Sequence, residues 1–217
     1  MTTILKPSIN TALASLFAKP AEEAAQRTAK LQMLRSYYAA CTRCPLGNLG
    51  RTQVIFGEGS STADVMLVGE APGRDEDKLG HPFIGRSGRL LTKILEELGL
   101  ARTTLFISNT AKCRPPENRQ PTLAESTTCI NHILLREIAI VRPRIICTLG
   151  AVPTSAFIEL DGALSPWRGK FLHTPYFVLM PTYHPAYLLR NNTAIDTVKS
   201  DFLRVIEYIK TSAIVPF

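Results

Sequence analysis

Val65-Met66-Leu67-Val68-Gly69-Glu70-Ala71-Pro72-Gly73 indicates the fold class most clearly, because a short apolar run leads directly into a loop rich in glycine and proline. Three further apolar runs follow, at residues 105–108, 144–147 and 177–180. Runs that are apolar at every position are typical of strands buried on both faces of a parallel sheet. Helical patterns separate the runs, at residues 88–98, 123–140, 151–159 and 195–209. Strand and helix therefore alternate, which predicts a three-layer α/β/α fold around a central, mostly parallel sheet.

The length and composition indicate one globular domain. The chain has 217 residues, of which 45% are hydrophobic and 20% are charged. Residues 1–20 show no clear periodicity, so we expect a disordered or loosely attached N-terminal tail, and then a single domain over residues 21–217. No apolar stretch approaches the roughly 20 residues that span a bilayer, and no signal peptide is visible. We expect a monomer inside the cell, in the cytoplasm.

The charge balance favours a polyanionic partner. Lys and Arg number 25 against 18 Asp and Glu, a net charge of +7. Such an excess is compatible with nucleic acid as a partner, although many basic proteins bind none.

Four of the five cysteines flank predicted loops, namely Cys41, Cys44, Cys113 and Cys129. In an intracellular protein this arrangement indicates metal ligation or redox chemistry more often than disulfides. The spacing alone leaves a zinc site and a four-thiolate iron–sulfur cluster equally open. Cys147 lies inside an apolar run and is expected to be a buried core residue.

The chemistry is expected in the loops that follow three of the strands. Ligands of such folds bind beyond the carboxyl ends of the strands, and these loops begin at Gly69, Asn109 and Pro181. The first loop resembles a phosphate cradle in its glycines, but it also contains Glu70, Asp75, Glu76 and Asp77. Carboxylates would repel a phosphate and favour acid–base chemistry instead.

The combination of motifs resembles the family 4 uracil-DNA glycosylases. The features that carry the resemblance are the Gly69–Gly73 loop, Pro82-Phe83-Ile84-Gly85, the four loop cysteines and His184-Pro185. The similarity extends over about Tyr38 to Tyr208. It implies a [4Fe–4S] cluster held by the four loop cysteines, and the excision of uracil from single- or double-stranded DNA as a step of base-excision repair.

The resemblance assigns roles to residues of the three loops. His184 corresponds to the histidine that donates to uracil O2, which suits a reaction whose leaving group is an anion. Asn109 corresponds to the residue that reads the uracil edge, and Phe83 to the aromatic ring that stacks on the flipped base. Phe83 could instead be a simple core residue.

Two positions depart from other families of the fold. Where an aspartate and a tyrosine flank the loop proline in those families, this chain has Ala71 and Gly73. We therefore expect Glu70 to activate water and the backbone near Ala71 to supply a second donor. Glu76 is expected to fill the space near uracil C5, unless it is a solvated surface carboxylate. Asn118 matches a further substrate-site position of the family.

Basic residues around the loops are candidates for DNA contacts, and a leucine is a candidate wedge. The basic residues are Arg114, Arg119, Arg168, Lys170 and Arg190. Taken singly, each of them is more simply a surface charge. Leu188, four residues after His184, is expected to enter the gap left by the flipped base.

Three other classes of protein remain open on this sequence. A non-catalytic iron–sulfur or zinc module that binds nucleic acid would not need Asn109, Phe83 and His184 together. An electron carrier would leave the acidic loop unexplained. A variant trapped covalently on uracil-DNA carries an inserted basic loop with a histidine, and residues 113–129 contain neither.

Overall fold

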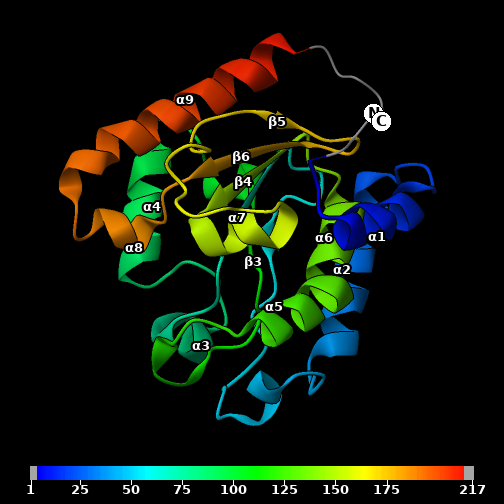
Figure 1. Cartoon of the computed structure of the whole chain (residues 1–217). Helices are drawn as coiled ribbons and strands as arrows, with labels where there is room; N and C mark the ends of the chain where they lie inside the picture. The colour runs from blue at the N-terminus through cyan, green and yellow to red at the C-terminus, as the bar shows by residue number, and fades with distance from the viewer. Residues whose placement is uncertain (1–3, 213–217) are drawn as a thin grey trace.

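A six-stranded, mostly parallel sheet forms the centre of the molecule, in a computed structural model that describes residues 4–212 (Figure 1). The strands are β1 (Glu58–Gly59), β2 (Val65–Gly69), β3 (Phe106–Asn109), β4 (Ile145–Leu149), β5 (Leu172–His173) and β6 (Val178–Thr182). Their order is β1-β3-β2-β4-β6-β5, in which the four central strands are parallel and the two short edge strands antiparallel. The four long strands are those that the apolar runs predicted.

Helices cover both faces of the sheet, which confirms the predicted three layers (Figure 1). The helices of one face are α1 (Pro7–Phe17), α2 (Ala24–Tyr38), α6 (Leu135–Val141) and α7 (Ala151–Phe157). Those of the other face are α4 (Arg86–Glu97), α8 (Pro185–Leu188) and α9 (Ile195–Thr211). The shorter α3 (Arg74–Leu79) and α5 (Leu123–Cys129) lie beyond the carboxyl ends of the strands, and a π-helical segment (Ile130–Leu134) joins α5 to α6.

Alternate residues of each central strand pack on opposite helical layers. In β2, Met66 and Val68 belong to the core shared with α1 and α6, whereas Val65 and Leu67 belong to the core shared with α4 and α9. Both faces of the strand are therefore buried, which explains why its sequence is apolar throughout.

The N-terminal segment differs from the loose tail that the sequence predicted. Residues 7–17 form helix α1, in which Ile9 and Leu13 are buried against the core containing α6. Leu5 forms an antiparallel bridge with Ile158. Proline at the first helical position favours the helix start, and burial of these side chains stabilises its docking. The domain therefore includes residues that we had placed outside it, while residues 1–3 lie outside the described part.

The topology brings the three expected loops to one edge of the sheet. β2, β3 and β6 are central parallel strands, so their carboxyl ends lie on the same side.

Within residues 4–212, none of the helices combines the length and apolar character needed to cross a bilayer.

Candidate active site and cysteine cluster

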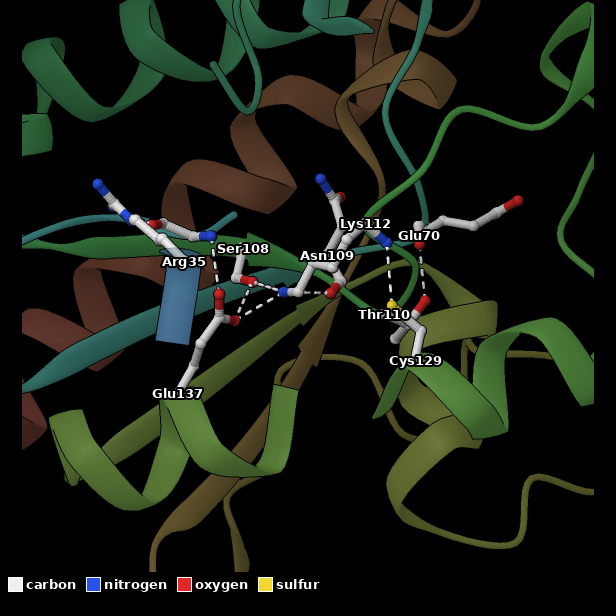
Figure 2. Close-up of polar contacts among 9 residues, drawn as sticks. Arg35, Glu70, Ser108, Asn109, Thr110, Lys112, Cys129 and Glu137 are labelled. Atoms are coloured by element: carbon white, nitrogen blue, oxygen red, sulfur yellow. Dashed lines mark hydrogen bonds and ion pairs between the residues drawn. The ribbon is translucent and has the colours of Figure 1, made fainter. Parts of the chain in front are cut away.

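The loops after β2 and β3 are joined by backbone hydrogen bonds. Gly69 pairs with Asn109 in the parallel register. Beyond that pair, the Thr110 N–H donates to the Gly69 carbonyl at 2.9 Å. The Thr110 hydroxyl donates to the Glu70 carbonyl at 2.7 Å, as Figure 2 shows. These bonds fix Glu70 beside Asn109 at the end of the sheet.

Gly69 allows two side chains to converge over the strand end. A Cβ atom at Gly69 would lie 2.4 Å from Cζ of Phe83 and 2.5 Å from Oδ1 of Asn109. Only glycine leaves room for the aromatic ring and the amide at these distances. Asn109 itself is buried, and its Oδ1 has no hydrogen-bond partner among residues 4–212. A buried acceptor without a partner is costly, which points to a ligand that would satisfy it.

Phe83 is held in an unfavourable backbone conformation. Its φ angle is +53°, in the left-handed region that aromatic residues rarely adopt. Arg102 holds this turn by donating to the carbonyls of Pro82 and Phe83, at 2.8 and 3.1 Å. A Cβ atom at Gly88 would lie 2.1 Å from the Phe83 carbonyl oxygen, so glycine is needed for this packing. Such strain is typical of functional positions.

His184 is the N-cap of α8 and lies beside Phe83. Its Nδ1 accepts a hydrogen bond of 3.1 Å from the Ala186 N–H, and its ring centroid lies 5.9 Å from that of Phe83. Burial lowers the pKa of His184 to about 4, an effect that the nearby Glu76 carboxylate opposes only in part. At neutral pH the imidazole is therefore uncharged, with Nε2 as its donor nitrogen.

Glu76 is buried and connects the starts of two helices. Its Oε2 accepts from the Gly73 N–H at 3.1 Å, while its Oε1 accepts from the N–H groups of Ile84 and Gly85 at 3.0 and 2.8 Å. The alternative of a solvated surface carboxylate is wrong, because only 8% of the residue is exposed. Glu76 therefore fixes the loop that carries Phe83 as well as facing the cavity.

Glu70 supplies a carboxylate without a fixed partner. Its side chain makes no hydrogen bond or ion pair with another residue of the described chain, and burial raises its pKa. The backbone N–H of Ala71 likewise donates to no other residue within 4–212. Both groups are thus available to a ligand.

These groups surround a cavity of about 550 Å³. All seven predicted catalytic and substrate-binding residues line it, together with two predicted DNA contacts: Glu70, Ala71, Glu76, Phe83, Asn109, Asn118, His184, Arg119 and Arg190. The volume is within the range of small-molecule pockets and suits a flipped nucleotide.

The four loop cysteines line a second, smaller cavity. Arg51 donates to Cys113 Sγ at 3.0 Å, and the Lys112 N–H donates to Cys129 Sγ at 3.2 Å. Burial raises the pKa of Cys113 to about 11 and that of Cys129 to about 12. Among the described residues, no three His, Cys, Asp or Glu side chains form a group that could hold one metal ion. Cys147 is buried in β4, as predicted, and belongs to the hydrophobic core.

Comparison with known proteins shows the family to which this chain belongs. Residues 56–210 match the uracil DNA glycosylase superfamily. A type-4 uracil-DNA glycosylase of Thermotoga maritima is 44% identical over 161 residues, which cover 70% of this chain and 80% of that protein. The type-4 enzymes of Sulfurisphaera tokodaii and Saccharolobus solfataricus are 40% and 38% identical, over 82% and 85% of this chain and 84% and 88% of theirs.

The chain belongs to the type-4 uracil-DNA glycosylases. The resemblance predicted from the sequence motifs is thereby confirmed, as is the fold class.

One DNA-contact prediction for this glycosylase is wrong, because Leu188 is fully buried. Leu188 ends the four-residue helix α8 and packs in the core shared with α4 and α9, where it cannot reach DNA. The neighbouring Tyr187 is instead 40% exposed and lines the cavity. Its ring packs on Tyr183 with 5.0 Å between centroids.

Two of the predicted basic contacts form ion pairs within the glycosylase. The Arg168 guanidinium donates to Asp201 at 2.6 Å, and that carboxylate also accepts from Thr182 in β6. Arg168 therefore supports the strand that leads to His184, and it lies outside the cavity lining. Arg119 lines the cavity but makes two 2.8 Å bonds to Glu125.

The other basic residues differ in their distance from the site. Arg114 lines a groove next to the cavity and donates to Asn118 Oδ1 at 2.7 Å. Lys170 is exposed and lies outside the lining of both the groove and the cavity. Its role in DNA binding stays a prediction.

The structure also adds residues that we did not select from the sequence of the glycosylase. Ser87 and Tyr187 line the cavity, and Arg74 and Arg86 line the adjacent groove. Ser87 could have been selected from the sequence, because it lies in Gly85-Arg86-Ser87-Gly88, at the start of a predicted helix. Tyr187 had no comparable signal.

Proposed function

We propose that this chain flips uracil out of single- or double-stranded DNA and hydrolyses its N-glycosidic bond, leaving an abasic site for base-excision repair. It acts as a monomer on DNA inside the cell. The observation that carries the proposal is the convergence of Asn109, Phe83 and His184 on one cavity at the carboxyl ends of the strands.

Asn109 reads the edge of the flipped base. Its unpartnered Oδ1 would accept from uracil N3–H, and its amide nitrogen would donate to O4. Phe83 stacks on the base, with its position set by the strained turn and by Gly69. Glu76, held by three backbone N–H groups, limits the space near uracil C5.

His184 and Ala71 stabilise the leaving group. When the bond between N1 of uracil and C1′ of the sugar breaks, its electron pair stays on the base, and negative charge develops on O2. A neutral His184 donates to O2 from Nε2, and the free backbone N–H of Ala71 supplies a second donor. Preorganised donors of this kind are worth about two to three orders of magnitude in rate.

Glu70 activates the water molecule that completes the reaction. Water oxygen bonds to C1′, and the Glu70 carboxylate accepts the proton that the water loses. A raised pKa makes Glu70 a stronger base than an exposed glutamate. The proton then passes to solvent, and the uracil anion takes up a proton after release.

The donor set of the cysteine cavity suits a [4Fe–4S] cluster, which Cys41, Cys44, Cys113 and Cys129 would hold as its thiolate ligands. The four side chains share one cavity but form no group suited to a single ion, whereas each thiolate of a four-iron cluster binds a different iron. When bound, such a cluster would supply a structural link. The residues that it joins are the segment after α2, the loop after β3 and the end of α5.

An excision assay tests the proposal directly. Matched oligonucleotides containing U, T, C or hypoxanthine, each single-stranded and in duplex, are incubated with excess protein, and abasic sites are counted after cleavage. We expect excision of U and none of T or C. A chain that leaves all uracil substrates intact, at an iron content of about four per chain, would exclude the proposed activity.

A further inference from the structure

A fully buried ion pair lies directly behind Asn109. Lys112 Nζ is 2.6 Å from Glu137 Oε2, and both side chains are only 1% exposed (Figure 2). Lys112 follows β3 in the loop that ends in Cys113, whereas Glu137 belongs to α6 on one face of the sheet. The pair therefore connects the end of the strand that carries Asn109 to a helix of the core.

The polar atoms of this pair are fully used. The Lys112 ammonium has three donors, and its acceptors are Glu137, the Ser108 hydroxyl and the backbone carbonyl of Asn109, the last at 2.9 Å. Glu137 also accepts from the Ser108 hydroxyl at 2.7 Å and from the Gly57 N–H at 2.8 Å. The network is thus closed, with no donor left for a ligand.

Stability alone is a weak reason for such a pair. Removing two charges from water is costly, and buried ion pairs can often be replaced by apolar residues without loss of stability. What the pair does provide is a fixed geometry at the Asn109 carbonyl. Because the Asn109 side chain has an unpartnered Oδ1, its orientation depends on the backbone that holds it.

The same lysine contacts a cysteine of the second cavity. Its backbone N–H donates to Cys129 Sγ at 3.2 Å, so Lys112 bonds to both Cys129 and Glu137. Glu137 comes eight residues after Cys129. Each residue of an α-helix is rotated by about 100° around the helix axis, so in a regular α-helix the two side chains would point in directions about 80° apart. The π-helical segment Ile130–Leu134 turns less per residue, which brings both to the side that faces Lys112. The wide turn of the π-helical segment therefore allows Cys129 and Glu137 to contact the same lysine.

We propose that the Lys112–Glu137 pair is a positioning device that sets the Asn109 peptide, and hence its amide, for reading uracil. The inference rests on the proposed function, because it acts through the reading role of Asn109. Lys112 and Glu137 do not touch the substrate.

A double-mutant cycle separates positioning from general stability. Single-turnover uracil excision is measured for the wild type, Lys112→Met, Asn109→Ala and the combined variant. We expect Lys112→Met to slow excision by about 10- to 100-fold, the scale of a small misplacement. In the Asn109→Ala background the same change should cost less than about threefold, because no amide is left to misplace.

A second variant keeps the test independent of folding. Lys112→Met leaves the Glu137 charge unpaired, so Glu137→Gln is added to remove that charge and keep an acceptor for the Gly57 N–H. We expect Lys112→Met/Glu137→Gln to regain much of the Tm without regaining the excision rate. It replaces Lys112→Met in the cycle if the single variant does not fold.

Ile138→Val is the matched control on the same helix. Ile138 is fully buried and faces the core around α1, so this change should lower the Tm and leave excision within about twofold. Iron content is measured for every variant, and we expect it to stay unchanged, because the bond to Cys129 comes from the backbone of residue 112.

The outcomes distinguish the inference from the function on which it rests. An equal loss in both backgrounds, or an excision rate that recovers together with the Tm, would overturn the positioning role alone. Wild-type excision in Asn109→Ala would overturn the reading role, and the positioning role with it.

Discussion

Nδ1 of His184 accepts a 3.1 Å hydrogen bond from the backbone N–H of Ala186, two residues further along the chain. Since Nδ1 is the acceptor, the proton of the neutral ring is on Nε2. The pKa of about 4 keeps the ring in this form at neutral pH. The helix cap therefore prepares a neutral donor for the leaving group.

His184→Ala is expected to slow single-turnover uracil excision by about two to three orders of magnitude, because an oxyanion donor is lost. Binding to uracil-containing DNA should change much less. His81→Ala serves as the control, since His81 is an exposed residue that pairs with Glu58. Excision within a few-fold of wild type in His184→Ala would exclude His184 as the O2 donor.

The pH dependence should report Glu70 rather than His184. The general base must be ionised, and burial raises the pKa of Glu70 above its ordinary 4.5, whereas His184 becomes charged only near pH 4. As pH falls, the single-turnover rate should therefore decline first through protonation of Glu70. Glu70→Gln should be much slower and should no longer show this decline of the rate at low pH. If the rate of Glu70→Gln declined at low pH in the same way as that of the wild type, the titration would belong to another group.

The cluster ligands can be tested by iron content. Anaerobically purified protein should be brown and contain about four irons per chain, and Cys113→Ser should lose colour and fold. Cys147→Ser is the control, because Cys147 lies in β4, away from the cavity lined by the other four cysteines. Stoichiometric zinc without iron would contradict the prediction.

The predictions from sequence succeeded where local pattern and structure coincide. The strand ending in Gly69 was recognisable because burial on both faces makes all of its residues apolar. Helix α1 was missed because only Ile9 and Leu13 are buried along it, too few for a clear helical period.

The candidate site was predictable to the extent that single motifs define it. Asn109 is the last residue of β3 and His184 comes two residues after the end of β6, so their convergence followed from the topology. Lys112 and Glu137 are 25 residues apart, and nothing in either segment indicates that their side chains meet. Leu188 was misplaced because its spacing from His184 did not reveal that the short helix turns it toward the core.

The burial of Leu188 and the exposure of Tyr187 allow a test of how duplex DNA is opened. Leu188→Ala should reduce the free energy of unfolding by about 2–5 kcal/mol, as expected for a cavity in the core. Tyr187→Ala should instead keep the stability and slow excision from duplex DNA by about tenfold, with less effect on single strands that need no opening. Thermal unfolding and single-turnover assays on both substrates distinguish the two. Equal losses on both substrates would show that Tyr187 does not act in opening the duplex.

Asn109 should decide between uracil and cytosine. Uracil presents N3–H and O4, whereas cytosine presents an N3 acceptor and an N4 amino donor. The buried Oδ1 and the amide nitrogen of Asn109 match the first pattern and leave groups unpaired with the second, which is strongly unfavourable. Asn109→Ala should therefore lose uracil excision without gaining cytosine excision.

Asn109→Asp extends this test, because it replaces the donor to O4 by a carboxylate. An ionised carboxylate can accept from N4 of cytosine, and a protonated one can also donate to N3. We expect a large loss of uracil excision, together with weak cytosine excision that grows as pH falls. Both variants are measured on U:G and C:G duplexes at several pH values. Uracil excision near the wild-type rate in Asn109→Ala would remove Asn109 from the reading role, and cytosine excision that rises with pH in Asn109→Asp would contradict the protonated carboxyl as the donor.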